Sequence, residues 1–362
     1  MSATSSAVEV HPLVFSNPAF KDHEQVVFCH DKESGLKAII GVHSTVLGPA
    51  LGGTRMWAYN SEAEAVRDVL RLSRGMTFKA SISGLNLGGG KAVIIGDSRT
   101  QKTEAMMRAF GRMVDRLGGS YITAEDVGIS TKDIEHVVKE TKHVTGIPIE
   151  MGGSGDPSPV TAYGTYMGIK ASAKYKWGSD DLNGRKALVQ GVGHVGITLV
   201  KHLTEAGVEV LVQDIHQDRI NMAVNEYGAT VYEGHYADAE VDVYAPCALG
   251  ATVNDDSLSR FRCSIIAGAA NNQLKDENVH GNEVRKRGIL YAPDFLINAG
   301  GLINVYSEIA KYDRNESLRR TEGIYDTTLE IFAHAETKGI STHNAALNIA
   351  QARIDAAKAA SK

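Results

Sequence analysis

Two lysines and one aspartate could bind an anion and transfer protons in this chain. Lys79 and Lys91 are twelve residues apart, and Asp126 ends the strand-like segment "SYITAED". If both lysines reached one pocket, their repulsion would lower the pKa of the more buried one and make it a general base, while the other bound a substrate carboxylate. Asp126 could exchange a proton with a substrate nitrogen. From spacing alone, exposed lysines and an aspartate that caps a turn are the more common outcome, because lysine is mostly exposed.

The glycine-rich stretch "GLNLGGGKAVIIG" (84–96) surrounds Lys91. It could be a phosphate-binding loop, a turn before a strand, or a device that holds Lys91 against a substrate. A Walker loop would need glycine at the position of Leu85 and Ser or Thr at the position of Ala92. We therefore expect the glycines to form the floor of a substrate site, where the missing side chains let a ligand approach the backbone, with the strand "AVII" after them.

A second glycine pattern, "VQGVGHVG", has the spacing of a dinucleotide-binding loop. Gly191, Gly193 and Gly196 follow a predicted strand and open a predicted helix, and Asp214 ends the next strand 23 residues after Gly191. A carboxylate there accepts bonds from the adenosine ribose and repels a 2′-phosphate, which favours NAD over NADP. The alternative is a glycine turn that binds no dinucleotide. The other loop residues in the candidate cofactor-binding set are Val192, His194 and Val195.

The elements that must position these residues fall into two halves, and 362 residues leave room for about two domains. In the first half, "EQVVFCHD" (24–31) and "GLKAIIGVHS" (35–44) predict two antiparallel strands. Apolar spacing and N-terminal capping residues predict helices over 61–76, 103–117 and 131–142. Strands and helices do not alternate regularly here.

The second half follows a glycine- and proline-rich stretch at 152–164 that predicts a linker. From Lys186, short apolar strands alternate with helices, which indicates a parallel sheet covered on both faces. We predict an α/β fold of two domains with a cleft between them: a first domain (1–148) that carries the candidate substrate residues and a Rossmann-type NAD-binding domain (149–340). The alanine-rich helix at 341–362 has no strand partner, and we expect it to pack back on the first domain. The apolar strands are "KALVQ", "VEVLVQD", "VDVYAP", "SIIAGAA" and "GILYAP".

Composition narrows the class of partner. The 43 acidic and 38 basic side chains give a net charge of −5, which offers no polycationic surface for nucleic acid or anionic lipid. The three cysteines are widely spaced, and the start "MSATSSAVEV" lacks a signal-peptide pattern, so we expect a cytoplasmic protein. The thirteen histidines form no H-E-x-x-H pattern and no C-x-x-C occurs, so we expect no metal. A G-x-S-x-G elbow for a serine hydrolase is also missing.

Nine segments, in order over nearly the whole chain, resemble the glutamate, leucine, phenylalanine and valine dehydrogenase family. Within it the resemblance is greatest to members that act on leucine, and next to those that act on valine. The segments are "GPALGGTRMW" (48–57), "RGMTFK" (74–79), "GLNLGGGKAVIIGD" (84–97), "TAEDVG" (123–128), "SGDPSPVTAYG" (154–164), "GVGHVG" (191–196), "PCALG" (246–250), "AGAANNQL" (267–274) and "LINAGGLINV" (296–305).

The resemblance implies a role for each matching residue. Lys79 would bind the α-carboxylate of an amino acid, Lys91 would be the base that activates water, and Asp126 would exchange protons with the reacting nitrogen. Gly52 and Gly53 would adjoin the substrate. The positions implied around the cofactor are Thr161, Cys247, Ala248, Ala269, Asn271 and Asn298.

Four positions bear on substrate choice. Glutamate enzymes of the family carry a lysine and a serine where this chain has Leu51 and Val305, so a glutamate side chain would be buried without a partner, at a cost of roughly several kcal/mol. Ala124 and Leu302 complete an implied apolar pocket. Leu302 stands where leucine enzymes commonly have valine, which would narrow it. One methylene is worth only about 1–3 kcal/mol, so the ranking of leucine, isoleucine and valine stays open.

We therefore expect reversible NAD-dependent oxidative deamination of branched-chain L-amino acids in their catabolism, with L-leucine preferred. The products would be the 2-oxo acid, ammonia and NADH. The resemblance also implies a homo-oligomer, an octamer in size, with residues 1–148 as the substrate-binding and oligomerisation domain. A valine or phenylalanine enzyme of the same family is the alternative. A protein that binds NAD without chemistry is a further one, weakened by the joint presence of Lys79, Lys91 and Asp126.

Overall fold

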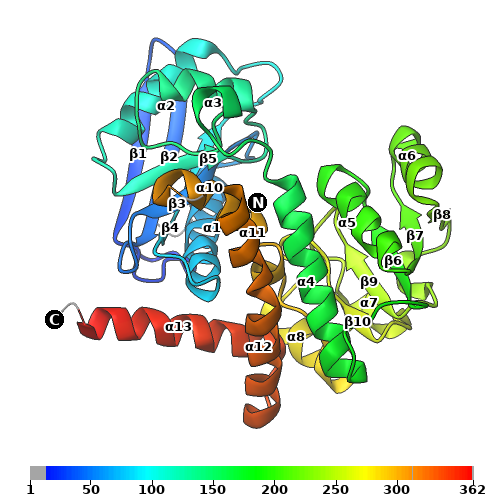
Figure 1. Cartoon of the computed structure of the whole chain (residues 1–362). Coiled ribbons are helices and arrows are strands. Elements are labelled where there is room, and N and C mark those ends of the chain that lie inside the picture. Colours follow the sequence, from blue (N-terminus) through cyan, green and yellow to red (C-terminus); the bar gives the residue numbers. More distant parts are fainter. Residues whose placement is uncertain (1–13, 312, 361–362) are drawn as a thin grey trace, which may run out of the picture. The chain divides into compact units, whose positions relative to one another are not determined.

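The computed structural model describes residues 14–311 and 313–360 (Figure 1). The N-terminal segment "MSATSSAVEV", on which the expected cytoplasmic location rests, lies outside these residues. The chain divides into two compact units, Met1–Thr77 with Asn86–Ile147, and Phe78–Leu85 with Pro148–Lys362. The sequence-based domain limits, 1–148 and 149–340, stay predictions. In the part of the chain that the structure describes, no helix is both long and apolar enough to span a membrane.

The first unit is built on a five-stranded mixed sheet in the order β1-β2-β4-β3-β5. The two predicted antiparallel strands are confirmed, and β2 also pairs antiparallel with β4. β3 runs parallel to both β4 and β5, so the carboxyl ends of these three strands meet at one edge. The strands are β1 (Gln25–Asp31), β2 (Leu36–Ser44), β3 (Ala50–Trp57), β4 (Gly88–Ile95) and β5 (Tyr121–Glu125).

Helices cover both faces of this sheet, each over its own apolar core. One core joins sheet residues such as Ile39 and Val93 to Val69 and Leu70 of α1 (Glu62–Ile82). The other packs the opposite side chains of the strands against α2 (Glu104–Asp115) and α3 (Thr131–Val138). Alternating strand residues therefore point into two separate cores, which fixes the register of the strands.

The second unit contains a six-stranded sheet in which every pairing is parallel. Its order, β11-β10-β9-β6-β7-β8, is the 3-2-1-4-5-6 order of a dinucleotide-binding fold read from the other edge. The predicted α/β class and parallel sheet are confirmed. The strands are β6 (Lys186–Gln190), β7 (Glu209–Gln213), β8 (Thr230–Val231), β9 (Val243–Pro246), β10 (Ile265–Ile266) and β11 (Leu290–Tyr291).

Helices make up most of the rest of this unit. Each of α5, α6 and α8 lies between consecutive strands in the chain, as the right-handed crossovers of a parallel sheet require. The 3-10 turns are η1 (Ile149–Met151) and η2 (Tyr236–Asp238). The helices are α4 (Ser158–Trp177), α5 (His194–Glu205), α6 (Gln217–Tyr227), α7 (Asp255–Arg260), α8 (Glu277–Lys286), α9 (Asp294–Ile297), α10 (Gly300–Ala310), α11 (Arg314–Glu322), α12 (Ile324–Lys338) and α13 (Thr342–Ala360).

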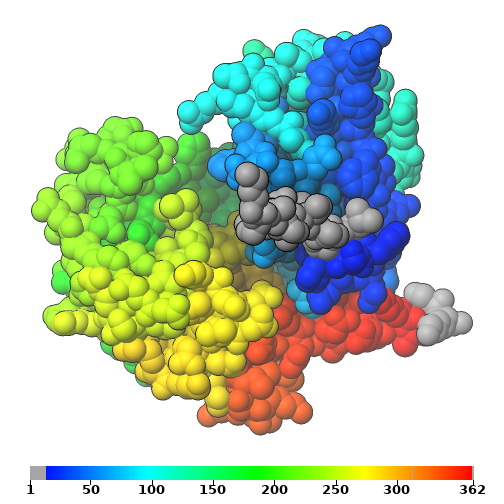
Figure 2. All heavy atoms as spheres, turned by 180° about the vertical axis from the view of Figure 1, so that it is seen from behind, coloured from blue at the N-terminus to red at the C-terminus, as the bar shows by residue number. Residues whose placement is uncertain are grey.

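The last helix, α13, contacts α12 and α8, and its surface is seen in red beside them in Figure 2. It also holds the C-terminal end of α1, whose residues from Phe78 onward belong to the same unit. Arg353 Nη1 donates to the carbonyls of Ser81 and Leu85 at 3.0 and 2.8 Å, and Ser81 Oγ donates to the Ala350 carbonyl at 2.7 Å. An arginine thus satisfies carbonyls that the end of a helix leaves without intrahelical partners.

Three of the differences from the predicted elements bear on the candidate site. The first helix does not end near residue 76 but continues to Ile82, which places Lys79 in its last turn. The glycines before Lys91 are not a turn but the first residues of β4. The predicted linker at 152–164 is only partly a linker, because α4 begins at Ser158 and has Pro159 in its first turn, where a helix tolerates proline.

Candidate active site

Lys91 and Asp126 form an ion pair at the edge where β3, β4 and β5 run parallel. Lys91 lies within β4 and is only 7% exposed, and Asp126 directly follows β5. Lys91 Nζ is 2.6 Å from Asp126 Oδ2. The alternative of a solvated lysine and a turn-capping aspartate is therefore wrong for this pair. A buried ammonium in direct contact with a carboxylate can pass a proton in either direction.

The carboxyl of Asp126 also contacts Arg55 of β3, at 3.3 Å from Nε to Oδ2. Burial of Asp126 acts to raise its pKa, but the charges of Lys91 and Arg55 outweigh this and hold the pKa below its usual value. Asp126 is therefore ionised at neutral pH.

The backbone around this ion pair is packed too closely for side chains. A Cβ on Gly52 would lie 1.7 Å from the Gly90 carbonyl oxygen, and one on Gly53 would lie 2.2 Å from that of Glu125. Gly53 is paired with Ala124 of β5. Leu51 and Ala124 are both buried in the same two strands. The structure thus places four predicted site residues of the first unit on β3 and β5 and a fifth directly after β5. They are Leu51, Gly52, Gly53 and Ala124, and Asp126.

Positions 88–90, before Lys91, need glycine for a different reason from the one predicted. A Cβ on Gly88, Gly89 or Gly90 would meet protein atoms: the Ser44 carbonyl oxygen at 1.9 Å, the Thr77 backbone nitrogen at 2.1 Å or the Tyr121 ring at 2.6 Å. We expected the missing side chains to leave room for a ligand. Instead, their space is filled by β2, α1 and β5, which the glycines allow to approach the strand that carries Lys91.

Lys79 belongs to the second unit, where its Nζ donates a 2.7 Å hydrogen bond to Oδ1 of Asn298. The Asn298 amide in turn donates to the Ala269 carbonyl at 3.0 Å and to Asn271 Oδ1 at 2.8 Å. Four predicted residues from three separate motifs therefore form one network. The convergence of Lys79 with Lys91 stays a prediction, because the two residues belong to different units.

The glycines of the "VQGVGHVG" loop occupy three distinct environments. Gly191 has a φ of +95°, and a Cβ there would lie 2.6 Å from the Ala248 side chain. A Cβ on Gly196 would lie 1.9 Å from the Gly191 carbonyl oxygen, so this glycine lets α5 pack on the loop. At Gly193 the nearest atom is Arg219 Nη1, 3.7 Å away. Protein atoms fill the space beside Gly191 and Gly196. The space beside Gly193 is open, as the close approach of a pyrophosphate requires.

Asp214 lies beside this loop. Its Oδ2 accepts a 2.8 Å hydrogen bond from the Val192 backbone N–H and its Oδ1 one of 2.9 Å from that of His216. His194, at the first position of α5, is 85% exposed and 3.8 Å from Asp156. Val195 is half-buried in the same turn. These residues fit a bound dinucleotide, with backbone N–H groups for phosphate and a carboxylate for ribose.

The predicted cofactor residues Cys247 and Ala248 follow β9. The Cys247 backbone N–H donates to the Gln190 carbonyl of β6 at 2.7 Å, which holds the start of their loop against the first glycine turn. Burial raises the pKa of the Cys247 thiol to about 12, so it stays protonated. The loop then pairs with the segment after β10, where Ala251 N–H donates to the Asn272 carbonyl at 2.8 Å. Asn271 of the Lys79 network directly precedes Asn272.

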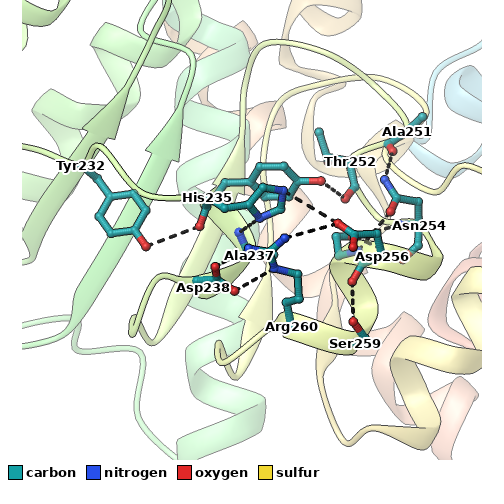
Figure 3. A network of polar contacts seen from close by, with 12 residues as sticks. Tyr232, His235, Ala237, Asp238, Ala251, Thr252, Asn254, Asp256, Ser259 and Arg260 are labelled. Atoms are coloured by element: carbon teal, nitrogen blue, oxygen red, sulfur yellow. Dashed lines mark hydrogen bonds and ion pairs between the residues drawn. The ribbon is translucent and has the colours of Figure 1, made fainter.

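A polar network anchors the far end of that loop (Figure 3). Tyr236 Oη of η2 donates to the Thr252 carbonyl at 2.9 Å, and Asn254 Nδ2 donates to the Ala251 carbonyl at 2.9 Å. Arg260 of α7 bonds both carboxylate oxygens of Asp238 and lies 3.7 Å from Asp256. These contacts fix the loop from outside the candidate cofactor site.

The remaining predicted residues lie on α4 and α10 of the second unit. Thr161 is in the first turn of α4, and a Cβ on Gly301 would lie 2.8 Å from its hydroxyl oxygen, so the glycines at the start of α10 admit α4. Leu302 and Val305 are buried on α10. Because these two residues belong to the second unit, their predicted approach to Leu51 and Ala124 of the first unit stays a prediction.

No group of three or more His, Cys, Asp or Glu side chains is placed to hold a metal within residues 14–311 and 313–360. The chemistry available here is that of an ammonium and a carboxylate in contact, with a dinucleotide fold in the same chain.

Comparison with known proteins decides the family. The description "Glu/Leu/Phe/Val dehydrogenase, dimerisation domain" matches residues 23–143, and "Glutamate/Leucine/Phenylalanine/Valine dehydrogenase" matches residues 212–361. The chain belongs to this family. It is an amino acid dehydrogenase, which confirms the resemblance found in the sequence.

Several relatives of this dehydrogenase are similar over nearly their whole length. Leucine dehydrogenase from Thermoactinomyces intermedius is 53% identical over 335 residues, which cover 92% of this chain and 91% of that protein. Valine dehydrogenase from Streptomyces virginiae is 47% identical, with 96% and 98% covered. The crystal structure of L-tryptophan dehydrogenase from Nostoc punctiforme matches with a TM-score of 0.83 at 45% identity, covering 93% of this chain and 97% of that one.

Sequence reasoning missed three residues of the dehydrogenase's candidate site. Arg55 contacts Asp126, Asp68 of α1 lies 3.2 Å from Arg55, and Tyr59 Oη donates a 2.7 Å hydrogen bond to Asp68. Arg55 stands in the segment "GPALGGTRMW" used for the family resemblance, but its contact with Asp126 spans 71 residues. Pairing of β3 with β5 brings them together, and no local pattern reports that pairing.

Proposed function

We propose that this dehydrogenase catalyses the NAD-dependent oxidative deamination of branched-chain L-amino acids, with L-leucine preferred. The observation that carries the proposal is the Lys91–Asp126 pair, 2.6 Å apart and set among glycines and apolar residues of β3, β4 and β5. Relatives at 51–53% identity named leucine dehydrogenase support the choice of substrate.

The roles of the residues follow from their charges. The Lys79 ammonium binds the α-carboxylate of the amino acid, and Asp126 takes a proton from its nitrogen. Bound NAD would supply the acceptor for the hydride that leaves Cα. Asp126 passes the proton taken from the substrate nitrogen to solvent and then receives one from Lys91, which as a neutral amine takes a proton from water while the water oxygen bonds to Cα. Asp126 gives its proton to the nitrogen and accepts one from the new hydroxyl as the C–N bond breaks, which releases ammonia and the 2-oxo acid. The direct contact of Asp126 with Lys91 lets a proton pass between them.

The choice of NAD rests on the loop between β6 and α5. Open space at Gly193 and the N-terminus of α5 suit a pyrophosphate, and the Asp214 carboxylate suits ribose hydroxyls but repels a 2′-phosphate. Val192, His194 and Val195 border that site. Thr161, Asn271 and Asn298 are assigned to the nicotinamide half, and Cys247, Ala248 and Ala269 to the cofactor site.

The choice of a branched-chain substrate rests on apolar side chains. We assign the substrate side chain to Leu51, Ala124, Leu302 and Val305, all less than 10% exposed. None offers a partner for a carboxylate, so glutamate is disfavoured.

We further propose that the enzyme is a cytoplasmic homo-oligomer, an octamer in size. The description of residues 23–143 as a dimerisation domain supports an oligomer. β1 is an edge strand of its sheet and carries Phe28, 59% exposed, which suits burial against a second copy.

The test of the proposed function is NADH formation with L-leucine, L-isoleucine, L-valine, L-phenylalanine, L-tryptophan and L-glutamate, each with NAD and NADP. The proposal predicts turnover with the three branched-chain substrates and NAD. Activity confined to glutamate would overturn the pocket assignment, and activity only with NADP would overturn the role of Asp214.

A further inference from the structure

Arg55 connects the Lys91–Asp126 pair to a second set of polar groups on the same unit. Its Nε is 3.3 Å from Asp126 Oδ2, while its Nη1 is 3.2 Å from Asp68 Oδ2. Asp68 lies on α1, and its Oδ2 also accepts a 2.7 Å hydrogen bond from Tyr59 Oη. The guanidinium is thus held between Asp126 and Asp68, and Tyr59 holds Asp68 from the loop that leads into α1.

All three ion-paired side chains are mostly shielded from water: Arg55 is 26% exposed, Asp68 17% and Asp126 22%. Screening is weak there, so the fork of the guanidinium can act on the orientation of Asp126. Lys91 and Arg55 both contact Oδ2 of Asp126. The carboxylate therefore has one oxygen fixed by two cations, which sets the direction of the other oxygen, Oδ1.

We propose that Arg55, anchored by Asp68 and Tyr59, is a positioning residue that orients the Asp126 carboxylate for proton exchange with the substrate nitrogen. This inference rests on the proposed function, because it assigns Asp126 a proton-transfer role. Arg55 contacts Asp126 and acts through it.

The charges around Asp126 support this role. Its facing groups are Lys91 of β4, Arg55 of β3 and, beyond Arg55, Asp68 of α1 and Tyr59, with Tyr121 on β5 itself. Burial would raise the pKa of Asp126, and Lys91 and Arg55 together lower it. Loss of Arg55 removes one of the two opposing charges, so the pKa of Asp126 rises and the acidic limb of activity moves to higher pH.

The test compares wild type, Arg55→Gln and Arg55→Lys by kcat, KM and the pH profile of kcat/KM with L-leucine. Arg55→Gln should lower kcat on the order of a hundredfold, leave KM for NAD within about twofold, and move the acidic limb to higher pH. Arg55→Lys keeps the charge but cannot contact Asp126 and Asp68 at once. Its kcat should fall, but its acidic limb should move less than that of Arg55→Gln, because the charge is kept. The two variants together separate the effect of orientation from the effect of charge.

Arg108→Gln is the matched control, since Arg108 forms an exposed pair with Glu140, 2.6 Å apart in the same unit, and should leave every parameter unchanged. If Arg55→Gln does not fold, Tyr59→Phe removes only the bond to Asp68 and should lower kcat roughly tenfold. The inference would be overturned by wild-type kcat and an unmoved acidic limb in folded Arg55→Gln, or in Tyr59→Phe if Arg55→Gln does not fold. Absence of leucine-dependent NADH formation in the wild type would instead reject the proposed function.

Discussion

Lys79 Nζ and Asn298 Oδ1 are joined by a 2.7 Å hydrogen bond between residues 219 positions apart in the chain. The first is the candidate ligand for the substrate carboxylate and the second a candidate cofactor residue. Asn298 is 4% exposed and also bonds Ala269 and Asn271. One buried amide therefore fixes the position of Lys79 relative to the loop after β10.

Asn298→Ala should raise KM for both L-leucine and NAD, because a single side chain holds Lys79 and the Asn271 loop. We expect about a tenfold increase in each, near the 1.4 kcal/mol of a lost buried hydrogen bond. Steady-state kinetics with each substrate varied in turn measures this. Asn282→Ala, which removes an exposed bond within α8, should change neither value. An increase in only one of the two KM values would separate the roles joined here.

Asp126→Asn should destabilise the enzyme in a pH-dependent way. The lowered pKa of Asp126 means that its contribution to stability is complete above the usual pKa of aspartate and is lost as pH falls through the lowered value. Removing the charge leaves Lys91 buried without its carboxylate, which costs about 3 kcal/mol near neutral pH. Denaturant unfolding should show this gap from wild type at pH 7 and a smaller gap below roughly pH 4. A gap that stays constant with pH would contradict an ionised Asp126.

Gly193→Ala and Gly196→Ala should fail in different ways. A methyl at Gly193 enters open space with an ordinary φ of −69°, so Tm should be nearly unchanged, while Kd for NAD rises about tenfold because the methyl occupies space needed by phosphate. A methyl at Gly196 would lie 1.9 Å from the Gly191 carbonyl oxygen, so Tm itself should fall. Thermal unfolding and calorimetric titration with NAD distinguish the two. Unchanged NAD affinity in Gly193→Ala would place the pyrophosphate elsewhere.

Phe28→Glu should shift the protein to a smaller oligomer. The substitution puts a charge on an exposed aromatic position of the edge strand β1 without entering a core. Light scattering after size-exclusion chromatography gives the mass, and Phe15→Glu, at an exposed position outside the sheet, is the control. The assignment of β1 as an interface would be wrong if both variants kept the wild-type mass.

The sequence predicted the second unit better than the first, because its signals are local. The glycine loop, Asp214 and the apolar strands each follow from a short window, and the parallel sheet is confirmed. In the first unit the decisive contacts are distant. The end of α1 is capped by Arg353 from α13, so no nearby residue announced that the helix continues past Lys79.

The glycines before Lys91 show the same limit of local patterns. Three consecutive glycines are typical of a turn, yet here they form a strand because Ser44, Thr77 and Tyr121 pack where side chains would be. The Arg55–Asp126 contact depends in the same way on strand pairing. Lys91 and Asp126 were candidates from their residue types, but spacing alone favoured exposed residues, and the family resemblance was needed to prefer the catalytic interpretation.

The role of Lys91 as the catalytic base is tested by the rate of NADH formation from L-leucine and NAD in wild type and Lys91→Ala, with NAD binding measured in parallel. Lys139→Ala, at an exposed position paired with Glu104, is the matched control. Lys91→Ala should lose at least about a thousandfold in kcat while Kd for NAD stays within about twofold, because Lys91 acts on water and lies outside the glycine loop. Turnover by Lys91→Ala within tenfold of wild type would contradict this role.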